Sequence, residues 1–427
     1  MNIWYLHPNA TPYEIPGLHR PFEFGEFFNR GGHKTTVFAS SYLHNAAYNL
    51  ITDNTLYIER KYDNIDTVFV RTCEYKNSGV KRVVNMLQFW KRLPKIAKIY
   101  AKKTVKPDII IASSPHPFAM IAGLKIAKKF RIPCICEVRD FWPEVFFYGG
   151  VIKEKSLIGK FLLAEERRIY EKADAITFLK EGDHTYITDR KWDNCNGGKI
   201  DMGKCIYINN GVDVDLYDKR LLENHYDDKD LDGKKFKIVY CGTIRPVNNV
   251  DLVLDTAKLL NDDYSFLIFG TGNCVDALKK RIEEERIYNV KLKGYVDNKF
   301  VPSILSRSSV NLLNYSGVAY NWSRGNSSNK LFEYLASGKP VLSTVKMGYD
   351  IIEKYNCGAS VEHTTACEIA AEIKKIKEMS DDKYAALCRN ARKAAEDFNI
   401  SNLADKYLTE IDWVIKKFNE KQRRVKK

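Results

Sequence analysis

The sequence predicts an α/β protein made of two doubly wound halves. Short apolar runs, such as residues 2–6, 33–40 and 107–114, alternate with longer segments of helical periodicity, which is the pattern of parallel strands joined by helices. The chain has 427 residues, more than one typical core accommodates. A polar, charged stretch at 214–235 separates two such alternations. We therefore expect two α/β domains with a linker between them.

The first domain is expected to span residues 1–213. Its predicted strands cover 2–6, 33–40, 66–72, 107–114, 132–140, 173–180 and 204–213, and its predicted helices cover 20–30, 80–107 and 156–172. Pro94 is expected to divide the basic segment 80–107 into two helices, because proline removes a helical hydrogen bond. The glycine-rich segment 190–204 is expected to be a surface insertion.

The second domain is expected to span residues 236–397. In the final segment, 398–427, apolar residues recur at spacings of three and four, which is typical of an amphipathic helix (Ile400, Leu403, Tyr407, Ile411, Val414, Phe418). This helix is expected to cross back over the domain junction and to end in a basic tail. Ligands of open α/β sheets bind beyond the carboxyl ends of the strands, so we expect a site in a cleft between the two domains.

Composition narrows the function classes. The longest apolar runs are shorter than a transmembrane helix, and the N-terminus lacks the basic and apolar regions of a secretory signal. The 10 cysteines form no C-x-x-C pair, so we expect neither a metal site nor a disulfide framework. These features predict a protein of the cytoplasm.

The net charge of +14 predicts an anionic partner, and the charge is concentrated in residues 80–107, which hold nine Lys or Arg and no acid. Apolar residues are interleaved with these bases, a pattern typical of helices on anionic lipid surfaces. The bases expected to contact a membrane on its inner face are Lys91, Arg92, Lys95, Lys98 and Lys102. Two other interpretations stay open: an ordinary solvated helix face, and a nucleic-acid-binding surface, although no recognised nucleic-acid motif is present.

The segment RGNSSNKLFEYLASGKPVLST (324–344) predicts a loop, a short helix and a strand. Ser327 or Ser328 is expected to cap the helix, whose free N–H groups attract phosphate. Lys330 lies in the first helical turn, where the helix dipole disfavours a cation unless an anion is present. Glu333 follows one turn later on the same side, and an ordinary surface pair of these two residues is the alternative.

Three other loops follow strands of the second half. They supply Gly242 and Arg245, then Gly270 and Gly272, and then Tyr295 and Val296. A lone glycine turn or a lone arginine says little. Gathered at one sheet edge, these residues suit a nucleoside diphosphate, with cations on the phosphates and a carboxylate on the ribose hydroxyls.

The order G-T-I-R, G-T-G, K-G-Y-V and N-K-L-F-E-Y-L-A-S-G-K-P-V resembles the donor domain of retaining glycosyltransferases of family four (group 1), which have the GT-B fold of two Rossmann-like domains. INNGVD, SSPHPF and EVRDFWPE resemble corresponding parts of enzymes that build bacterial surface polysaccharides, of the L-fucosamine-transferase-like kind. The resemblance covers nearly the whole chain.

The resemblance implies a role for each matching position. Catalytic roles fall on Arg245, Lys330 and Asp140, and acceptor-side roles on Gly17, His116 and Arg139. Donor-binding roles fall on Glu333, Ser328, Asn329, Gly242, Gly270, Gly272, Tyr295, Val296 and Arg324. The chain departs from the family at four positions: Gly325 replaces the first acid of E-x7-E, Thr243 and Asn248 replace a basic pair, and Arg139 replaces a histidine.

The implied activity is transfer of a sugar, with retention and without a metal or other cofactor, from a nucleotide sugar such as a UDP-linked N-acetylated sugar. The implied acceptor is a lipid-linked saccharide of capsule or O-antigen synthesis. A sugar-nucleotide epimerase of the same fold is the nearest alternative, and a basic nucleic-acid-binding protein is the alternative from another class.

Overall fold

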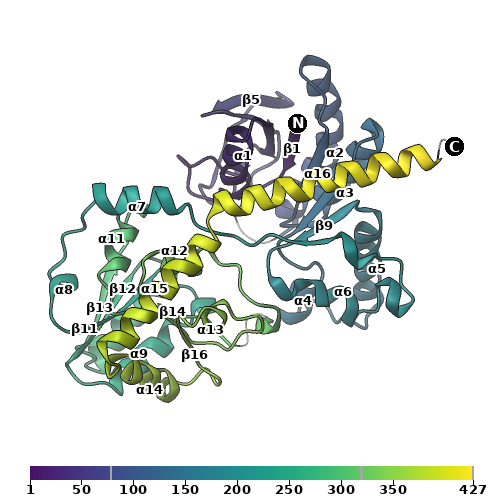
Figure 1. The fold of residues 1–427 in the computed structure, drawn as a ribbon. Helices are drawn as coiled ribbons and strands as arrows, with labels where there is room; N and C mark the ends of the chain where they lie inside the picture. Colours follow the sequence, from purple (N-terminus) through teal and green to yellow (C-terminus); the bar gives the residue numbers. More distant parts are fainter. Residues whose placement is uncertain (77–78, 318–320, 426–427) are drawn as a thin grey trace. The chain divides into compact units, whose positions relative to one another are not determined.

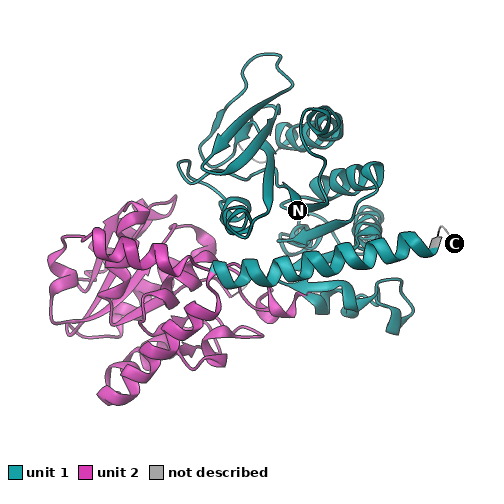
Figure 2. Cartoon of the chain, turned by 45° about the horizontal axis from the view of Figure 1, so that its top comes forward, with its two compact units in different colours: residues 1–179, 184–208, 400–427 teal, residues 180–183, 209–399 magenta. Residues whose placement is uncertain are grey.

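The computed structural model describes residues 1–76, 79–317 and 321–425. Figure 1 shows the chain from end to end, and Figure 2 colours its two compact units. Unit 1 comprises residues 1–179, 184–208 and 400–427, and unit 2 comprises residues 180–183 and 209–399. The last helix therefore belongs to unit 1, although it follows unit 2 in the sequence.

Unit 1 is built on an eight-stranded sheet of order β10-β9-β8-β7-β1-β2-β6-β5. Neighbouring strands pair in parallel except for β5 and β6. The strands are β1 (Asn2–Leu6), β2 (Lys34–Ser40), β5 (Tyr57–Tyr62), β6 (Ile65–Val70), β7 (Ile109–Ser113), β8 (Cys134–Val138), β9 (Ala175–Phe178) and β10 (Cys205–Tyr207), and β3 (Tyr42–Leu43) pairs separately with β4 (Tyr48–Asn49). The strand order reverses between β1 and β7, which is where such sheets bind ligands.

Helices pack on both faces of this sheet. The helices of unit 1 are α1 (Arg20–Arg30), α2 (Val80–Lys103), α3 (Pro117–Phe130), α4 (Glu144–Tyr148), α5 (Leu157–Lys172), α6 (Thr185–Asp189) and α16 (Ile400–Val425). Helix α3 packs against β7, β8, α2 and α5, whereas α1 packs against β2 and α16. The buried rings of Phe24 and Phe28 contact that of Tyr407, which joins α16 to α1.

Unit 2 repeats the design on a six-stranded parallel sheet of order β13-β12-β11-β14-β15-β16. The strands are β11 (Phe236–Cys241), β12 (Tyr264–Phe269), β13 (Val290–Gly294), β14 (Val310–Leu313), β15 (Val341–Ser343) and β16 (Gly358–Ser360). The helices are α7 (Val214–Glu223), α8 (Lys229–Asp232), α9 (Val250–Lys258), α10 (Val275–Glu284), α11 (Val301–Ser306), α12 (Asn329–Ala336), α13 (Ile351–Lys354), α14 (Ala366–Lys377) and α15 (Asp381–Asp397). Here the strand order reverses between β11 and β14.

Three local predictions differ from the structure. Pro94 does not divide α2, because the apolar stripe on both sides of it, including Phe89, Leu93 and Ile96, is buried and holds one continuous helix. Segment 190–204 is not a surface insertion, since Trp192 and Ile200 are buried in the core of unit 1. The supposed linker 214–235 contains α7 and α8 and belongs to unit 2.

Helix α2, which contains most of the basic segment 80–107, has one face toward the core and another toward solvent. Most of its apolar residues after the first turn face the core, whereas Val80, Val83 and Val84 are exposed. Lys91, Lys95, Lys98 and Lys102 are exposed, and Arg92 is half-buried. Arg92 also donates to the carbonyl oxygen of Arg71 at 2.5 Å. Among the described helices, none combines the length and apolar character needed to cross a bilayer.

Candidate functional site

The first element of the site is a set of loops joined by backbone hydrogen bonds at the carboxyl ends of β11, β12 and β13. The N–H of Gly242 donates to the carbonyl oxygen of Phe269 at 2.9 Å, and that of Gly270 donates to Gly294 at 2.7 Å. The N–H of Ile244 donates to Thr271 at 2.9 Å. These bonds hold the three loops as one rigid edge of the sheet.

Glycine is required where these loops touch. A Cβ on Gly270 would lie 1.9 Å from the carbonyl oxygen of Gly242, and one on Gly272 would lie 1.9 Å from that of Ile244. A Cβ on Gly242 would lie 2.7 Å from Cε of Lys330. The first two glycines therefore permit the close approach of backbones, and the third permits the lysine side chain to lie along the loop.

Lys330 is the cation at the centre of this edge. Its ammonium lies 3.1 Å from the hydroxyl oxygen of Tyr240, and over the rings of Tyr240 and Tyr315 at 4.9 and 5.3 Å from their centroids. The Asn248 amide, oriented to satisfy both of its groups, brings its oxygen to 3.0 Å from the ammonium. Burial lowers the pKa of Lys330 to about 8 and outweighs the attraction of Glu333. Among the residues that the structure describes, no carboxylate is bonded to this cation.

Glu333 lies one turn further along α12. Burial raises its pKa to about 7, against the opposing effects of Arg220 and Lys330. Within the described part of the chain, the carboxylate accepts no hydrogen bond and forms no ion pair, so the predicted alternative of a Lys330–Glu333 surface pair is absent there. A half-buried carboxylate in this state is free to accept hydrogen bonds from a ligand.

The start of α12 is uncapped. Ser328 is the residue at the cap position, but its side chain makes no capping bond, so the predicted cap is wrong. Its hydroxyl oxygen is buried without a partner among the described residues, and so is the amide nitrogen of Asn326. Asn329 is exposed beside them. The free N–H groups of the first turn and these polar atoms favour an anionic ligand.

Two asparagines that the sequence did not single out shape this loop. The Asn209 side chain donates to the carbonyl oxygen of Asn326 at 3.1 Å, and that of Asn210 donates to Ser327 at 2.5 Å. Asp213 then caps α7 through the N–H of Leu216 at 2.9 Å. These residues lie in the INNGVD motif (208–213), from which their importance could have been predicted.

The remaining donor-side candidates differ in exposure. Arg245 is exposed, and its guanidinium makes no hydrogen bond or ion pair with the described residues. It lies near enough to Lys330 to depress the pKa of that ammonium. Tyr295 is 74% exposed and Val296 is half-buried, directly after Gly294 with its φ of +78°. Arg245 and Tyr295 are thus available to a ligand at this edge.

Arg324 and Gly325 precede α12 and are both constrained by their surroundings. Arg324 is buried, and with Lys180 it counteracts the burial that raises the pKa of Asp183 to about 6. Gly325 has a φ of +103°, and a Cβ there would lie 3.3 Å from the carbonyl oxygen of Gly348. An acidic residue at position 325 would therefore be strained.

The acceptor-side candidates lie in unit 1, at the switch between β1 and β7. His116 is buried, its Nδ1 has no partner among the described residues, and burial lowers its pKa to about 3. His7, which the sequence analysis did not single out, is also buried, with its Nε2 lacking a described partner. Burial, and then Arg139 and His116, lower the pKa of His7. Both imidazoles are neutral at pH 7, and His7 lies close enough to the guanidinium of Arg139 for that charge to lower the His7 pKa.

The other two acceptor-side positions have different environments. Asp140 is exposed after β8. Gly17 packs against Thr11, because a Cβ on Gly17 would lie 2.1 Å from the Thr11 hydroxyl oxygen. Below them, the buried Glu137 carboxylate accepts hydrogen bonds from Arg20 at 2.9 Å, Tyr5 at 2.8 Å and Ser113 at 2.6 Å. Its contacts show it to be part of the framework.

Solved structures place this fold in a known class. HepE from Anabaena, crystallised with UDP, matches with a TM-score of 0.66 at 14% identity, over 96% of this chain and 100% of that one. Sucrose-phosphate synthase from Thermosynechococcus elongatus matches with a TM-score of 0.67 at 15% identity, over 97% and 98%. The protein has the GT-B fold, which confirms the predicted fold class.

Sequence comparisons give the family. The model described as Glycosyltransferase Family 4 matches residues 22–216, and that described as Glycosyl transferases group 1 matches residues 223–394. The chain belongs to the group 1 glycosyltransferases of family 4. A Bacillus subtilis (strain 168) relative, TuaH, whose name assigns it to teichuronic acid biosynthesis as a glycosyltransferase, is 27% identical over 250 residues. That match covers 56% of this chain and 57% of TuaH, so the chain spans little more than half the length of this curated relative.

Proposed function

We propose that the protein is a retaining glycosyltransferase that moves a sugar from a nucleotide sugar to a lipid-linked saccharide in surface polysaccharide synthesis. The observation that carries the proposal is the pair on α12, Lys330 and Glu333. Each is half-buried and has no ionic partner among the described residues, and both lie beside an uncapped helix start. A nucleoside diphosphate offers the complementary groups.

The donor is held as follows. Lys330 and the first-turn N–H groups of α12 bind the pyrophosphate, with Ser328 and Asn329 beside them, and Arg245 closes over it from the exposed loop. Glu333 accepts hydrogen bonds from the ribose hydroxyls, and the loop at Tyr295 and Val296 receives the base. The HepE structures contain UDP and UDP-glucose, which supports a UDP-sugar as donor.

In the transfer step, the bond between the anomeric carbon and the β-phosphate oxygen breaks. The acceptor oxygen bonds to the same face of that carbon, so the configuration is retained. The acceptor proton goes to the departing phosphate oxygen, and UDP and a glycoside are the products. Lys330 and Arg245 stabilise the charge that develops on the phosphate, so no metal ion is required.

Unit 1 supplies the acceptor side. Neutral His7 and His116 each offer a ring nitrogen to a saccharide hydroxyl, and Arg139 and Asp140 extend this polar edge. The name of TuaH supports a cell-envelope polysaccharide as the product, such as a capsule or an O-antigen. The exposed bases of α2 support a protein that works on the inner, anionic face of the cell membrane.

The test combines donor binding with product analysis. UDP-sugars are screened by thermal shift, because a ligand of the native state raises its apparent stability. The donor that stabilises most is then incubated with the protein and lipid-linked saccharides. Free UDP with a lengthened acceptor is the expected product, whereas an isomerised sugar nucleotide would make the protein an epimerase. Tight binding of DNA or RNA with no response to any sugar nucleotide would overturn the proposal.

A further inference from the structure

An exposed apolar cluster lies at the start of α5. Leu157 is 86% exposed, Ile158 is 64% exposed and Phe161 is 62% exposed, and Val151 in the preceding loop is 73% exposed. Large apolar side chains that cluster on a surface mark an interaction site, unlike single exposed ones. Helix α2 exposes only smaller apolar side chains in its first turn, Val80, Val83 and Val84, because larger ones such as Phe89 and Leu93 face the core.

Local structure holds this cluster outward. Ser156 caps α5 by accepting a hydrogen bond from the N–H of Gly159 at 3.0 Å. A Cβ on Gly159 would lie 2.5 Å from the carbonyl oxygen of Glu154, so the preceding loop packs on that side of the helix. The opposite side carries Leu157 and Phe161. The cluster is therefore part of a well-defined first turn.

Lysines flank the cluster. Lys153, Lys155 and Lys160 are exposed, and none of them makes a hydrogen bond or ion pair with its side chain among the described residues. The acid between them, Glu154, is bonded to Arg190 at 2.7 Å. An apolar first turn surrounded by unpaired bases is complementary to the headgroup region of an anionic bilayer.

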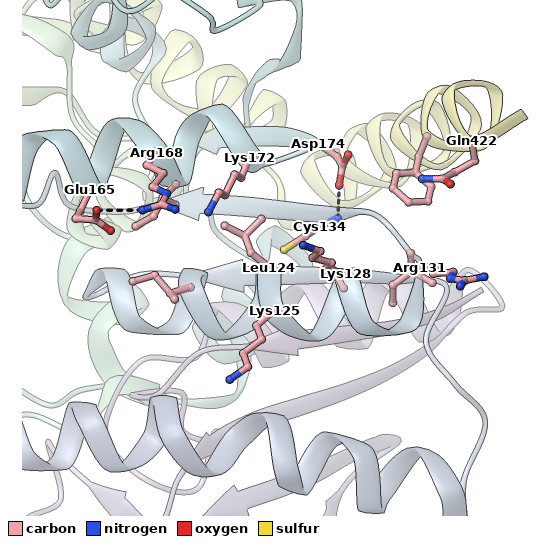
Figure 3. A pocket seen from close by; sticks show the side chains of 15 residues that line it. Leu124, Lys125, Lys128, Arg131, Cys134, Glu165, Arg168, Lys172, Asp174 and Gln422 are labelled. Atoms are coloured by element: carbon pink, nitrogen blue, oxygen red, sulfur yellow. Dashed lines mark hydrogen bonds and ion pairs between the residues drawn. The ribbon is translucent and has the colours of Figure 1, made fainter. Parts of the chain in front are cut away.

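The same helix borders a groove with cationic walls. A cavity of about 570 Å³ lies between α3 and α5, and the end of α16 contributes Phe418 and Gln422. Figure 3 shows Lys172 reaching from α5 toward Leu124 of α3, with Lys128 and Arg131 along α3 and its end. In the described part of the chain, these three bases have no hydrogen-bond or ionic partner.

The acids of the groove are already engaged. The Asp174 carboxylate accepts the N–H of Cys134 at 2.9 Å, and Glu165 lies 3.6 Å from Arg168. The floor of the groove is apolar, with Leu124, Ile132 and Ile169 among its lining residues. A ligand that fits has an anionic group on an apolar body.

Both features belong to one face of α5. With about 3.6 residues per turn, positions 157, 161, 165, 168 and 172 fall within a single arc of the helix. The apolar first turn is thus followed along this face by the residues that border the cationic groove. The groove opens near the amino ends of β8 and β9, the opposite sheet edge from His116 and Arg139.

We propose that the outer face of α5 docks on an anionic membrane, with its apolar first turn entering the headgroup region and the groove between α3 and α5 taking the phosphate of an anionic phospholipid. The inference deepens the proposed function and rests on it only for the reason why a membrane is needed. It assigns the main apolar contact to α5 and leaves to α2 mainly the electrostatic contribution of its exposed lysines.

The test is sedimentation of the full chain with vesicles of phosphatidylcholine and phosphatidylglycerol in equal parts, and with phosphatidylcholine alone. The triple variant Leu157→Gln, Ile158→Gln, Phe161→Gln is expected to lower the partition coefficient by roughly tenfold or more, because three apolar side chains leave the interface. Leu222→Gln, at a position 86% exposed in unit 2, is the control and is expected to bind as the unmodified chain does. Equal binding by the triple variant would overturn the assignment.

The groove is tested separately. The variant Lys128→Gln, Arg131→Gln, Lys172→Gln is expected to weaken binding to the anionic vesicles more than Lys279→Gln, Lys374→Gln, Lys383→Gln, which removes the same charge from exposed positions of unit 2. Equal losses would mean that net charge alone binds the membrane, and the groove would lose its role.

Two further measurements distinguish membrane docking from dimer formation and from misfolding. Light scattering without vesicles that shows a dimer, dissociated by the triple variant, would make the α5 face a contact between two copies of the chain and overturn the membrane assignment. Thermal shift with UDP reports donor binding and folding in every variant. Loss of vesicle binding with normal UDP binding supports the inference, whereas vesicle binding without any UDP response leaves the inference standing and removes the proposed function.

Discussion

Lys330 has an ammonium group in surroundings that disfavour its charge. Two aromatic rings and a hydroxyl oxygen contact it, and its pKa falls to about 8. A diphosphate bound there would supply the missing negative charge, so we expect this residue to contribute strongly to binding of the proposed donor. Arg245 differs because it is exposed and adds its charge only when its loop closes on the ligand.

Removing either cation should therefore abolish most turnover and leave the fold intact. We expect Lys330→Ala to lower kcat about 100-fold or more and Arg245→Ala to lose most turnover as well, because both stabilise charge on the leaving phosphate. UDP release measures the rate, and the melting temperature reports folding. Lys279→Ala, on the outer face of α10, is the control. Near-normal rates in both variants would remove these residues from the pyrophosphate site.

The affinity for UDP should depend on pH over a narrow range. Above pH 8 Lys330 loses its proton, and below pH 7 Glu333 gains one, so the tightest binding is expected between these values. The measurement is calorimetric titration of UDP across pH 5.5 to 9.5, roughly the span of both titrations. In Glu333→Gln the part of the acidic limb near pH 7 should disappear, which leaves only the fall near pH 6, roughly the pKa of the terminal phosphate of UDP, while the alkaline limb stays. A profile with an unchanged acidic limb would contradict the role of Glu333.

The Glu333 carboxyl group should also lower the stability of the folded protein as the pH rises. Its pKa is raised from an ordinary value of 4.5 to about 7, so ionisation in the folded state becomes unfavourable as the pH rises between these values. Relative to Glu333→Gln, the original chain is therefore expected to lose melting temperature from pH 4.5 to pH 7 and to change little above that. A constant difference across this range would show that Glu333 is not buried as described.

Residue types at the site were only partly predictable from the sequence. Lys330, Glu333 and Arg245 could be found because charged residues follow strands or open a helix at a phosphate-binding position. Tyr240 and His7 could not, because an aromatic residue within a strand and a histidine after one are equally common in ordinary cores. The reason for Gly325 required its φ of +103°, which the sequence does not reveal.

At the scale of elements, the donor edge depends on loops that touch backbone to backbone. The bond from Gly270 to Gly294 and the bond from Gly242 to Phe269 join β11, β12 and β13 beyond their paired regions. The sequence predicted these strands and their glycine turns. It did not predict that the glycines serve mutual contact between loops, because that role depends on distances between residues far apart in the chain.

Adding one methyl group at this contact should therefore be costly. Gly270→Ala is expected to destabilise unit 2 by about 2 kcal/mol or more and to weaken UDP binding, because its Cβ would collide with a carbonyl oxygen at 1.9 Å. Chemical denaturation measures the first effect. Gly233→Ala is the control, since the nearest atom to its Cβ is 3.5 Å away. A mild effect equal to that of the control would mean that the loops are not joined as described.

Helix α2 shows how packing decides between sequence interpretations. Its pattern of bases and apolar residues is typical of a membrane-surface helix and equally of a helix that covers a sheet. Burial of Phe89, Leu93 and Ile96 shows that the stripe covers the sheet of unit 1. The helix that the sequence periodicity predicted is confirmed. The structure was needed to show that its apolar face packs on the sheet of unit 1.

At the scale of the whole molecule, the chain visits unit 1 twice. Helix α16 returns to it after unit 2 and places Tyr407 against Phe24 and Phe28, with its hydroxyl 3.1 Å from that of Thr177. The two doubly wound sheets could be predicted because apolar strands alternate with helices in both halves. The exact division between the units could not, because α7 and α8 carry a polar, linker-like composition.

Removal of the Tyr407 ring should consequently loosen unit 1 selectively. Tyr407→Ala is expected to cost about 3–5 kcal/mol, because a fully buried aromatic ring is lost. Hydrogen exchange should accelerate in α1 and β9 and stay unchanged in α9 and β12. Uniform acceleration over both units would contradict the assignment of α16 to unit 1.

Removing metal ions tests whether Lys330 and Arg245 alone stabilise the negative charge of the leaving phosphate. With Lys330 and Arg245 on the phosphates, turnover is expected to stay the same, within about twofold, when EDTA is added. Loss of activity that Mg²⁺ or Mn²⁺ restores would show that the two side chains do not suffice.

If α12 and the joined loops of unit 2 bind a nucleoside diphosphate through Lys330, the loss of this one side chain should weaken UDP binding. The decisive experiment is calorimetric titration of UDP at pH 7.5 into the original chain and into Lys330→Ala. We expect one site in the original chain and at least about tenfold weaker binding in the variant, since a charge-assisted contact is lost. Absence of binding to the original chain, or equal affinity in the variant, would contradict this role of Lys330.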